Sequence, residues 1–564
     1  MKICHLNAPL AALLAAAVGS CVDKDYNLDD IDTTSQFRVN NLVIPINIEQ
    51  INLSTVIDID DESDIKIIDG EYAYVTDGDF STSSISIPEV RIKAAEINPL
   101  SVDLTLPGFV TQPLQYFQLP DYSIDIPEES TTYDFSAANV TSDICDLTRV
   151  GGDFDVYVKI EVKGVETLAS SYSIKNLQIQ LPRGLEFTTT SGKYDSATGI
   201  LTINGDVTSP TLEISGRATA LNIPTGAFSE SEHTLSLTGG VGIIGGSLAI
   251  SPRADWSIPS RLGLDLKFSF SDIEVKSIDG VVQHSIDNVK IPDIDISNLP
   301  DLLAQSGTNL VLANPRLYLD VNNPLYTTGV YAHTGFEITS FHGTEGVTRS
   351  IDNSYLTIAA NATDYLVLSP EAPAGHEAYT HVPFTGLRDV LSGNGLPDKL
   401  EVELTDPKLP RQTIANFPIG YNFGEITGNY RFEAPLQFGA GTRIEYKEVN
   451  DGWGDEDIEN LTIEHLEVSM KVTTDVPVSI DLVCYPLNSK GERMNVTISP
   501  LNIEANANNQ QVTLGIDGVI RDLDGIEFTA TASAQSDASA LSPNMSITIS
   551  ELRPCVSGYY EKEL

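Results

Sequence analysis

The stretch FDVYVKIEV, Phe154–Val162, decides the fold class, because its apolar and polar residues alternate strictly. Successive side chains of an extended strand point to opposite faces, so this alternation gives one buried face and one wet face. The same alternation recurs in LGLDLKFSF, Leu262–Phe270, and in LEVSMKV, Leu466–Val472. Helical patterns are scarce and short. We therefore predict an all-β protein: several antiparallel β-sandwich domains, immunoglobulin-like or similar, in series with a few short helices.

Breaks rich in proline, glycine or acidic residues divide the chain near Pro127, Pro252, Pro370 and Asp451. A chain of 564 residues is long enough for three or four domains at about 150 residues each. We predict a signal peptide at 1–20, an acidic tether at 21–40, a β domain at 41–128, β-sandwiches at 129–254 and 255–370, a β domain at 371–450 and a C-terminal β-sandwich at 451–564.

Two segments, one beginning near Ser297 and the other near Thr385, have similar sequence patterns. Each has a turn or two of helix, a glycine and then an alternating strand, and Leu299 of the first corresponds to Leu387 of the second, 88 residues later. That spacing is the size of a sandwich domain, so the echo suggests a related unit used twice. Chance similarity is the alternative.

The N-terminus has the organisation of an export signal. Lys2 is followed by an apolar run, Leu10–Val18, which is too short to cross a bilayer. The run ends in Val18-Gly19-Ser20-Cys21. This tetrapeptide resembles the lipobox of bacterial lipoproteins, in which lipid is attached to the cysteine thiol and the chain is cut just before it. The resemblance implies lipidation of Cys21. The alternative is an ordinary secretory signal with an incidental cysteine.

The residues after the cysteine are acidic. VDKDYNLDDID, Val22–Asp32, resembles the export signal of Bacteroidetes-type surface lipoproteins. That resemblance covers the N-terminal region only. It implies a protein of the bacterial outer membrane, anchored by lipid and facing the cell exterior. The polar run would then be a solvated tether, and the membrane would be a partner through the N-terminal lipid.

The net charge of the chain limits the kinds of molecule that it can bind. The chain has 79 acidic residues against 33 lysines and arginines, a formal net charge of −46. Phosphate backbones would be repelled, so nucleic acid is excluded as a partner. A strongly acidic surface favours solubility and can recruit cations. The protein or glycan ligand is not identified by these features.

One acidic loop is a candidate metal site. NDGWGDEDIEN contains the carboxylates of Asp451, Asp455, Asp457 and Glu459, oxygen donors of the kind that Ca²⁺ prefers. The spacing does not match an EF-hand, and hydration of the loop is the alternative. We expect no other cofactor.

Three cysteines remain after Cys4 leaves with the signal and Cys21 takes lipid. Their spacing is not that of a zinc site, which needs close pairs. Cys484 and Cys555 lie in the same terminal region, so a disulfide between them is one hypothesis for an oxidising envelope. Buried thiols are the alternative for these two and for Cys145.

Two motifs look catalytic but do not fit their chemistry. GGVGIIGG holds Gly240, Gly242 and Gly245 in the spacing of a dinucleotide site, but Pro252 follows too soon for the required helix. Two strands linked by glycines, or a glycine-rich strand against which another backbone packs closely, explain it better. His376 and His381 in GHEAYTH are five residues apart, whereas a zinc-protease helix needs four. We therefore predict that the protein is not an enzyme.

The leading hypothesis is a lipid-anchored cell-envelope protein with a structural or adhesive binding role. One alternative is a glycan-binding lipoprotein that serves an outer-membrane nutrient transporter, and clustering of tyrosines on one loop face would favour it. The other is a hydrolase with an unrecognised site, which a converging His/Asp/Ser group or a pair of carboxylates would favour.

Overall fold

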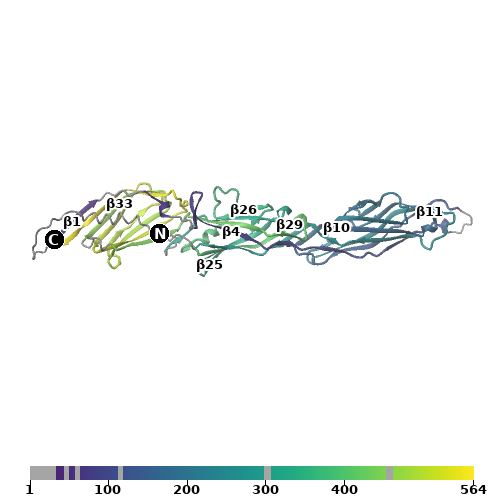
Figure 1. Cartoon of the computed structure of the whole chain (residues 1–564), viewed down its shortest axis with the longest axis horizontal. Helices are drawn as coiled ribbons and strands as arrows, with labels where there is room; N and C mark the ends of the chain where they lie inside the picture. The colour runs from purple at the N-terminus through teal and green to yellow at the C-terminus, as the bar shows by residue number, and fades with distance from the viewer. Residues whose placement is uncertain are drawn as a thin grey trace.

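The computed structural model describes residues 34–43, 50–57, 64–111, 118–296, 307–394, 396–452 and 461–563. Of these residues 63% lie in strands and 4% in helices, so the prediction of an all-β fold with few short helices is confirmed. The chain forms an elongated rod (Figure 1). We describe three sandwiches along it: proximal, which contains both ends of the described chain, then middle, then distal.

The proximal sandwich consists of two six-stranded sheets. One contains β1 (Thr34–Val43), β2 (Ile51–Asn52), β33 (Leu461–Thr474), β35 (Thr497–Ser499), β37 (Gln510–Ile520) and β39 (Ser546–Glu563). The other contains β22 (Asn309–Leu310), β28 (Gly393–Asn394), β32 (Arg443–Asn450), β34 (Ser479–Asn488), β36 (Leu501–Ile503) and β38 (Leu523–Ser533).

The middle sandwich pairs a six-stranded sheet with part of a ten-stranded one. The six-stranded sheet has the order β27 (Thr380–Pro383), β26 (Thr363–Ser369), β23 (Arg316–Asn322), β31 (Thr427–Pro435), β4 (Glu71–Ser81), β3 (Ile65–Ile68). Facing it are β20 (Ser277–Ser285), β21 (Val289–Asp295), β24 (Ala332–His342), β25 (Glu345–Ile358) and β29 (Lys399–Pro418).

The distal sandwich contains the rest of the ten-stranded sheet: β7 (Leu100–Asp103), β10 (Ile144–Lys163), β12 (Leu185–Thr188), β15 (Thr211–Asn222) and β18 (Gly263–Phe270). Its other sheet contains β6 (Arg91–Ala94), β8 (Tyr122–Asp125), β9 (Glu129–Ala137), β11 (Ala169–Gln180), β13 (Gly192–Asp195), β14 (Ile200–Ile203), β16 (Phe228–Ser229), β17 (Thr234–Pro252) and β19 (Ile273–Glu274). A separate pair joins β5 (Ile85–Ile87) to β30 (Tyr421–Gly424).

Helices in the described residues are single turns. They are α2 (Leu53–Val56), α3 (Gly108–Thr111), α5 (Gly386–Val390) and the 3₁₀ turns η2 (Val165–Thr167) and η3 (Tyr326–Thr328). In η2 the preceding Gly164 has a left-handed φ of 78°, which glycine adopts without strain. These turns connect strands and contribute little of the core.

The chain runs out along the rod and back, so strands far apart in sequence are neighbours. Thr34 of β1 pairs with Glu563 of β39, and Tyr74 of β4 pairs with Ala434 of β31. These pairings cross the predicted boundaries at 128/129, 254/255, 370/371 and 450/451. Each sandwich is assembled from several separated segments, whereas the prediction placed each in one continuous interval.

The twenty-residue strand β10 joins the middle and distal sandwiches by pairing with strands of both. The first part of β10 pairs with β20, at Ile144 and Val282, and its second part pairs with β18, at Val156 and Phe270. At one end β29 continues the sheet beyond β20, pairing Thr413 with Val281. One apolar core extends through both sandwiches and into the edge of the proximal one.

The predicted alternation is realised in the strands that suggested it. Val156, Val158 and Ile160 of β10 are each at most 1% exposed, and the polar residues between them face outward. The glycine-rich motif lies within β17, between β9 and β11, and a Cβ on Gly242 would come within 2.1 Å of the Glu129 carbonyl oxygen. The close approach of a second backbone explains that glycine.

The two echoing segments meet in space. Asn309 of β22 pairs with Asn394 of β28, and the strands that follow them, β23 and β29, lie in the two facing sheets of the middle sandwich. The helical turn of the second segment is α5, whereas residues 297–306 of the first lie outside the described residues.

Candidate functional site

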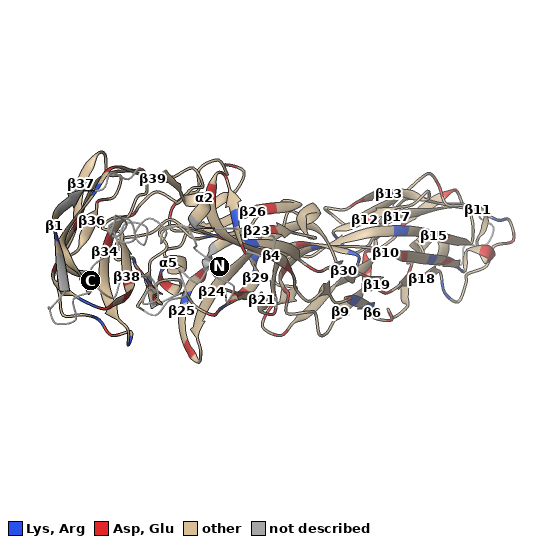
Figure 2. Cartoon of the chain, turned by 60° about the vertical axis from the view of Figure 1, so that its left-hand side comes forward, with Lys and Arg blue, Asp and Glu red and all other residues tan. Residues whose placement is uncertain are grey.

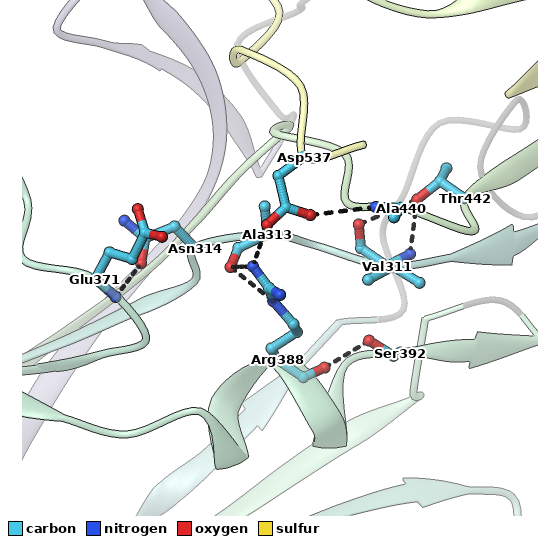
Figure 3. A network of polar contacts seen from close by, with 9 residues as sticks. All are labelled: Val311, Ala313, Asn314, Glu371, Arg388, Ser392, Ala440, Thr442 and Asp537. Atoms are coloured by element: carbon cyan, nitrogen blue, oxygen red, sulfur yellow. Dashed lines mark hydrogen bonds and ion pairs between the residues drawn. The ribbon is translucent and has the colours of Figure 1, made fainter. Parts of the chain in front are cut away.

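A polar junction fixes the proximal sandwich to the middle one (Figure 3). Arg388 of α5 donates hydrogen bonds from Nε and Nη2 to the carbonyl of Ala313, at 2.9 and 2.7 Å. The same Nη2 forms an ion pair with Oδ2 of Asp537 at 2.9 Å. Asp537 lies between β38 and β39, and its other oxygen accepts from the amide of Ala440 at 3.2 Å. One guanidinium therefore ties two connections between the sandwiches, which contain α5 and Ala313, to the β38–β39 loop of the proximal sandwich.

Thr442 completes this junction. Its buried hydroxyl accepts from the Val311 amide at 3.0 Å and donates to the Val311 carbonyl at 3.1 Å. Nearby, Asn314 accepts from the Glu371 amide at 3.0 Å and Ser392 donates to the Arg388 carbonyl at 2.6 Å. These contacts fix the segment that leads into β23, a strand of the six-stranded middle sheet. The outer side of this sheet is the one that faces away from the sandwich core.

That outer side carries a cluster that we call the tyrosine face: Tyr318, Tyr365 and Tyr379 with Asp320, Asn429 and Arg431. Its basis is the strand sequence RLYLDVN, in which Leu317, Leu319 and Val321 face the core and the residues between them face out. Register aligns Tyr365 of β26, Asp320 of β23 and Asn429 of β31 in one row. Asp79 of β4 extends that row.

The segment between β26 and β27 folds over part of this face. The ring of Tyr379 lies edge-on to Tyr318, with centroids 4.9 Å apart, and also edge-on to Tyr365, at 5.6 Å. His376 of the same segment lies 5.2 Å from the Tyr318 ring and 3.4 Å from the Asp69 carboxylate. As a result Tyr318 is only 1% exposed, although it points away from the sandwich core.

Beneath the cover lies a buried carboxylate. The Glu433 side chain is 1% exposed and forms ion pairs with Nε of Arg431 at 3.1 Å and Nη1 of Arg316 at 3.8 Å. Neither carboxylate oxygen has a hydrogen-bond partner among the described residues. The Arg431 guanidinium lies over the Tyr318 ring, 4.6 Å from its centroid. Glu433 thus holds the guanidinium against the aromatic ring.

Burial also alters the acidity of two of the tyrosines. It raises the pKa of Tyr318 to about 12, with the Glu433 charge acting in the same direction. Burial and a hydrogen bond to Asp320 raise the pKa of Tyr379 to about 12. Both hydroxyls therefore keep their protons at neutral pH, and neither is suited to act as a nucleophile or base there.

Several predicted site residues lie outside the described residues. These are Cys21 and three members of the candidate calcium loop, Asp455, Asp457 and Glu459. Asp451, the fourth member, is described and exposed. No group of three metal-ligating side chains converges within the described ranges. Acidic residues are spread along the rod rather than gathered at one point (Figure 2).

Cys484 and Cys555 are not joined by a disulfide. Cys484 of β34 is buried in the proximal core with Ile463 and Ile516, and burial raises its thiol pKa to about 12. On β39, Val556 packs against that core. Its neighbour Cys555 therefore points to the opposite face of the sheet, which explains why the hypothesis of a disulfide fails.

The histidines of GHEAYTH serve different contacts. His376 contacts Tyr318 of the tyrosine face, whereas Nε2 of His381 lies 3.1 Å from the Ser369 carbonyl. The tyrosine face was not predicted from the sequence, although the alternation in RLYLDVN places Tyr318 on the outward side of a strand.

No protein-family model and no curated protein matches the chain. Among solved structures, a protein from Parabacteroides distasonis inferred to be secreted is 14% identical, with a TM-score of 0.34, over 50% of this chain and 89% of its own. The triple jelly roll turret protein of an archaeal virus is 11% identical with a TM-score of 0.12, over 83% and 91% of the two chains. The VP2 subviral particle of infectious bursal disease virus is 7% identical with a TM-score of 0.12, over 84% of each. Likenesses this weak carry no argument about function.

Among the described residues no helix is both long and apolar enough to cross a membrane.

Proposed function

We propose that this protein is a lipid-anchored surface protein of the bacterial outer membrane, a stalk with a structural or adhesive binding role. The observation that carries the proposal is the position of the chain ends. Thr34 pairs with Glu563 at one end of the rod, and the expected lipid site Cys21 precedes Thr34 by only 13 residues. An anchor there would leave the distal sandwich at the far end (Figure 1).

Continuity along the rod supports a role as a spacer. The pairing of β10 with β18 and β20 joins the distal and middle sandwiches in one sheet, and the Arg388–Asp537 pair ties the middle to the proximal one. A rod built this way keeps its far end away from the membrane, which flexible linkers between separate domains would not do. The proposal assigns no catalysis.

Cys21→Ala tests the anchor, because thioether-linked lipid needs the thiol. Metabolic labelling with palmitate and membrane fractionation should find wild-type protein labelled and membrane-bound, and Cys21→Ala unlabelled and released. Cys4→Ala is the matched control, since Cys4 lies in the segment expected to be removed. Protease treatment of intact cells should digest the wild type. Membrane retention of unlabelled Cys21→Ala, or protection of the wild type in intact cells, would refute the proposal.

A further inference from the structure

The row Tyr365–Asp320–Asn429–Asp79 crosses four adjacent strands on the outer side of the middle sandwich. Neighbouring strands are about 4.8 Å apart, so this row spans about 14 Å. The next row toward the rim contains Thr363, Asn322 and Thr427, which are hydrogen-bonded to one another through their side chains. Short polar side chains therefore form a flat surface beside the tyrosines.

The aromatic edge of this surface is exposed. Tyr365 keeps 44% of its surface accessible although it contacts Tyr379. The two rings meet edge to face, with an interplanar angle of 73°, and form an angled wall. An aromatic wall offers an apolar surface to C–H groups, and the row beside it offers carboxylate acceptors and an amide that both donates and accepts.

The wall is ordered before any ligand binds. Tyr379 is held by ring contacts with Tyr318, which lies beneath it, and with His376. Arg431 is held by the buried Glu433 and by the Tyr318 ring. A pre-ordered surface loses little conformational entropy on binding, which favours affinity. The buried Glu433 contributes to this order through its ion pairs with Arg431 and Arg316.

The charge of the face limits the ligand. Asp77, Asp79 and Asp320 lie on the same side of the sheet as Arg431, whereas the Arg316 guanidinium there is paired with Glu433. The formal net charge of the whole protein is −46. Phosphorylated, sulfated and uronic-acid ligands would be repelled. A ligand with C–H faces, many hydroxyl groups and no charge matches the surface.

We propose that the tyrosine face binds a neutral oligosaccharide, with one sugar ring stacked on Tyr365 and its neighbours hydrogen-bonded to Asp320, Asn429 and Asp79. This binding does not depend on the lipid anchor. Cys21→Ala should change the location of the protein and leave its sugar binding intact, so the two proposals can fail separately.

Native affinity electrophoresis tests the proposal with the full-length protein purified in detergent. The gels contain glycogen, galactomannan, xyloglucan or mixed-linkage β-glucan as neutral polymers, and polygalacturonate as an acidic one. We expect at least one neutral polymer to retard the wild type. Tyr365→Ala should weaken that retardation by about tenfold or more, and Asn429→Ala should weaken it less.

Matched variants separate binding from folding. Tyr421→Ala removes another exposed tyrosine, on β30 outside this face, and should bind like the wild type. Tyr365→Phe keeps the ring and should retain most of the binding. Thermal unfolding checks that each variant is folded, which is expected because Tyr365 is outside the core. Retardation by none of the neutral polymers, by polygalacturonate alone, or equally in wild type and Tyr365→Ala would overturn the proposal.

Discussion

Asp143 and His284 are hydrogen-bonded next to β10 and β20, where the middle and distal sandwiches meet. Asp143 immediately precedes β10, and His284 lies in β20, which connects β10 to β29. Their side chains are only 18% and 21% exposed, and Nδ1 of His284 is 3.0 Å from Oδ1 of Asp143. The Thr141 hydroxyl donates to the other oxygen at 2.8 Å. The carboxylate is therefore held on both sides.

This arrangement makes a prediction about acid stability. Burial alone would raise the pKa of Asp143, but the hydrogen bonds from His284 and Thr141 outweigh it and lower the pKa below its usual value. A folded-state pKa below the unfolded one stabilises the protein above the unfolded pKa, about 3.9, and this stabilisation is lost as pH falls through the folded pKa. Asp143→Asn should cost about 1–2 kcal/mol at pH 5 and progressively less below pH 4.

Urea unfolding measured from pH 6 to pH 2.5 checks this expectation. Asp287→Asn, which changes an exposed aspartate two residues beyond β20, is the control and should have little effect at any pH. A cost of Asp143→Asn that stays constant down to pH 2.5 would contradict the role given to its charge. Sequence could not reveal this pair, because the two residues are 141 positions apart and neither sits in a motif.

Among the elements, β17 shows how much a sequence pattern can predict. The glycines in GGVGIIGG were expected to lie in a strand closely approached by another backbone, and β17 runs between β9 and β11 in that way. Composition and the early Pro252 were enough to exclude a phosphate-binding helix. The identity of the strands that approach was not predictable, since β9 precedes β17 by about a hundred residues and nothing local selects it.

Gly240 and Gly242 of β17 provide a matched pair of substitutions. A Cβ on Gly242 would lie 2.1 Å from the Glu129 carbonyl oxygen and 2.7 Å from the Ser130 Cα, so the backbone of β9 would have to move. A Cβ on Gly240 would find its nearest atom at 3.8 Å, an ordinary contact. Gly242→Ala should destabilise the protein by about 2 kcal/mol or more, and Gly240→Ala should be neutral or slightly stabilising.

Thermal and urea unfolding of the two variants measure this difference. Both remove a glycine from the same strand, so a change in the flexibility of the unfolded chain cancels between them. Equal stabilities would mean that β9 moves easily to make room for the added methyl group, contrary to the close packing of its backbone against Gly242.

At the scale of the whole molecule, the sequence predicted the strands and their buried faces but not how the strands pair into sandwiches. Alternation in β10, β18 and β33 identified strands with one buried face, because burial is a property of each strand's own residues. Strand partners depend on contacts across hundreds of residues, such as Thr34 with Glu563, which local patterns do not encode. The tyrosine face was missed for the same reason, since its members come from β23, β26, β31 and the segment after β26.

We expect the shared sheet to make the middle and distal sandwiches unfold as one unit. In β20, Gly280 pairs with both Leu147 of β10 and Ile414 of β29, and a Cβ there would lie 2.1 Å from the Asp146 carbonyl oxygen. Gly280→Ala should therefore weaken the pairing of β20 with both β10 and β29. Because a single apolar core spans the two sandwiches, we expect both to lose the same stability, about 2 kcal/mol.

Native-state hydrogen exchange can test this coupling with local probes. The amides of Leu266 in β18 report on the distal sandwich and those of Ile338 in β24 on the middle one, and both should lose protection to the same extent in Gly280→Ala. The amide of Leu482 in β34 lies in the proximal sandwich, whose interior holds separate apolar clusters, and it should be unaffected. A loss confined to β18 or to β24 would show that the sandwiches unfold independently despite their common sheet. Equal losses at both sites would show that β20 couples the middle and distal sandwiches into one body, which the proposed role as a stalk requires.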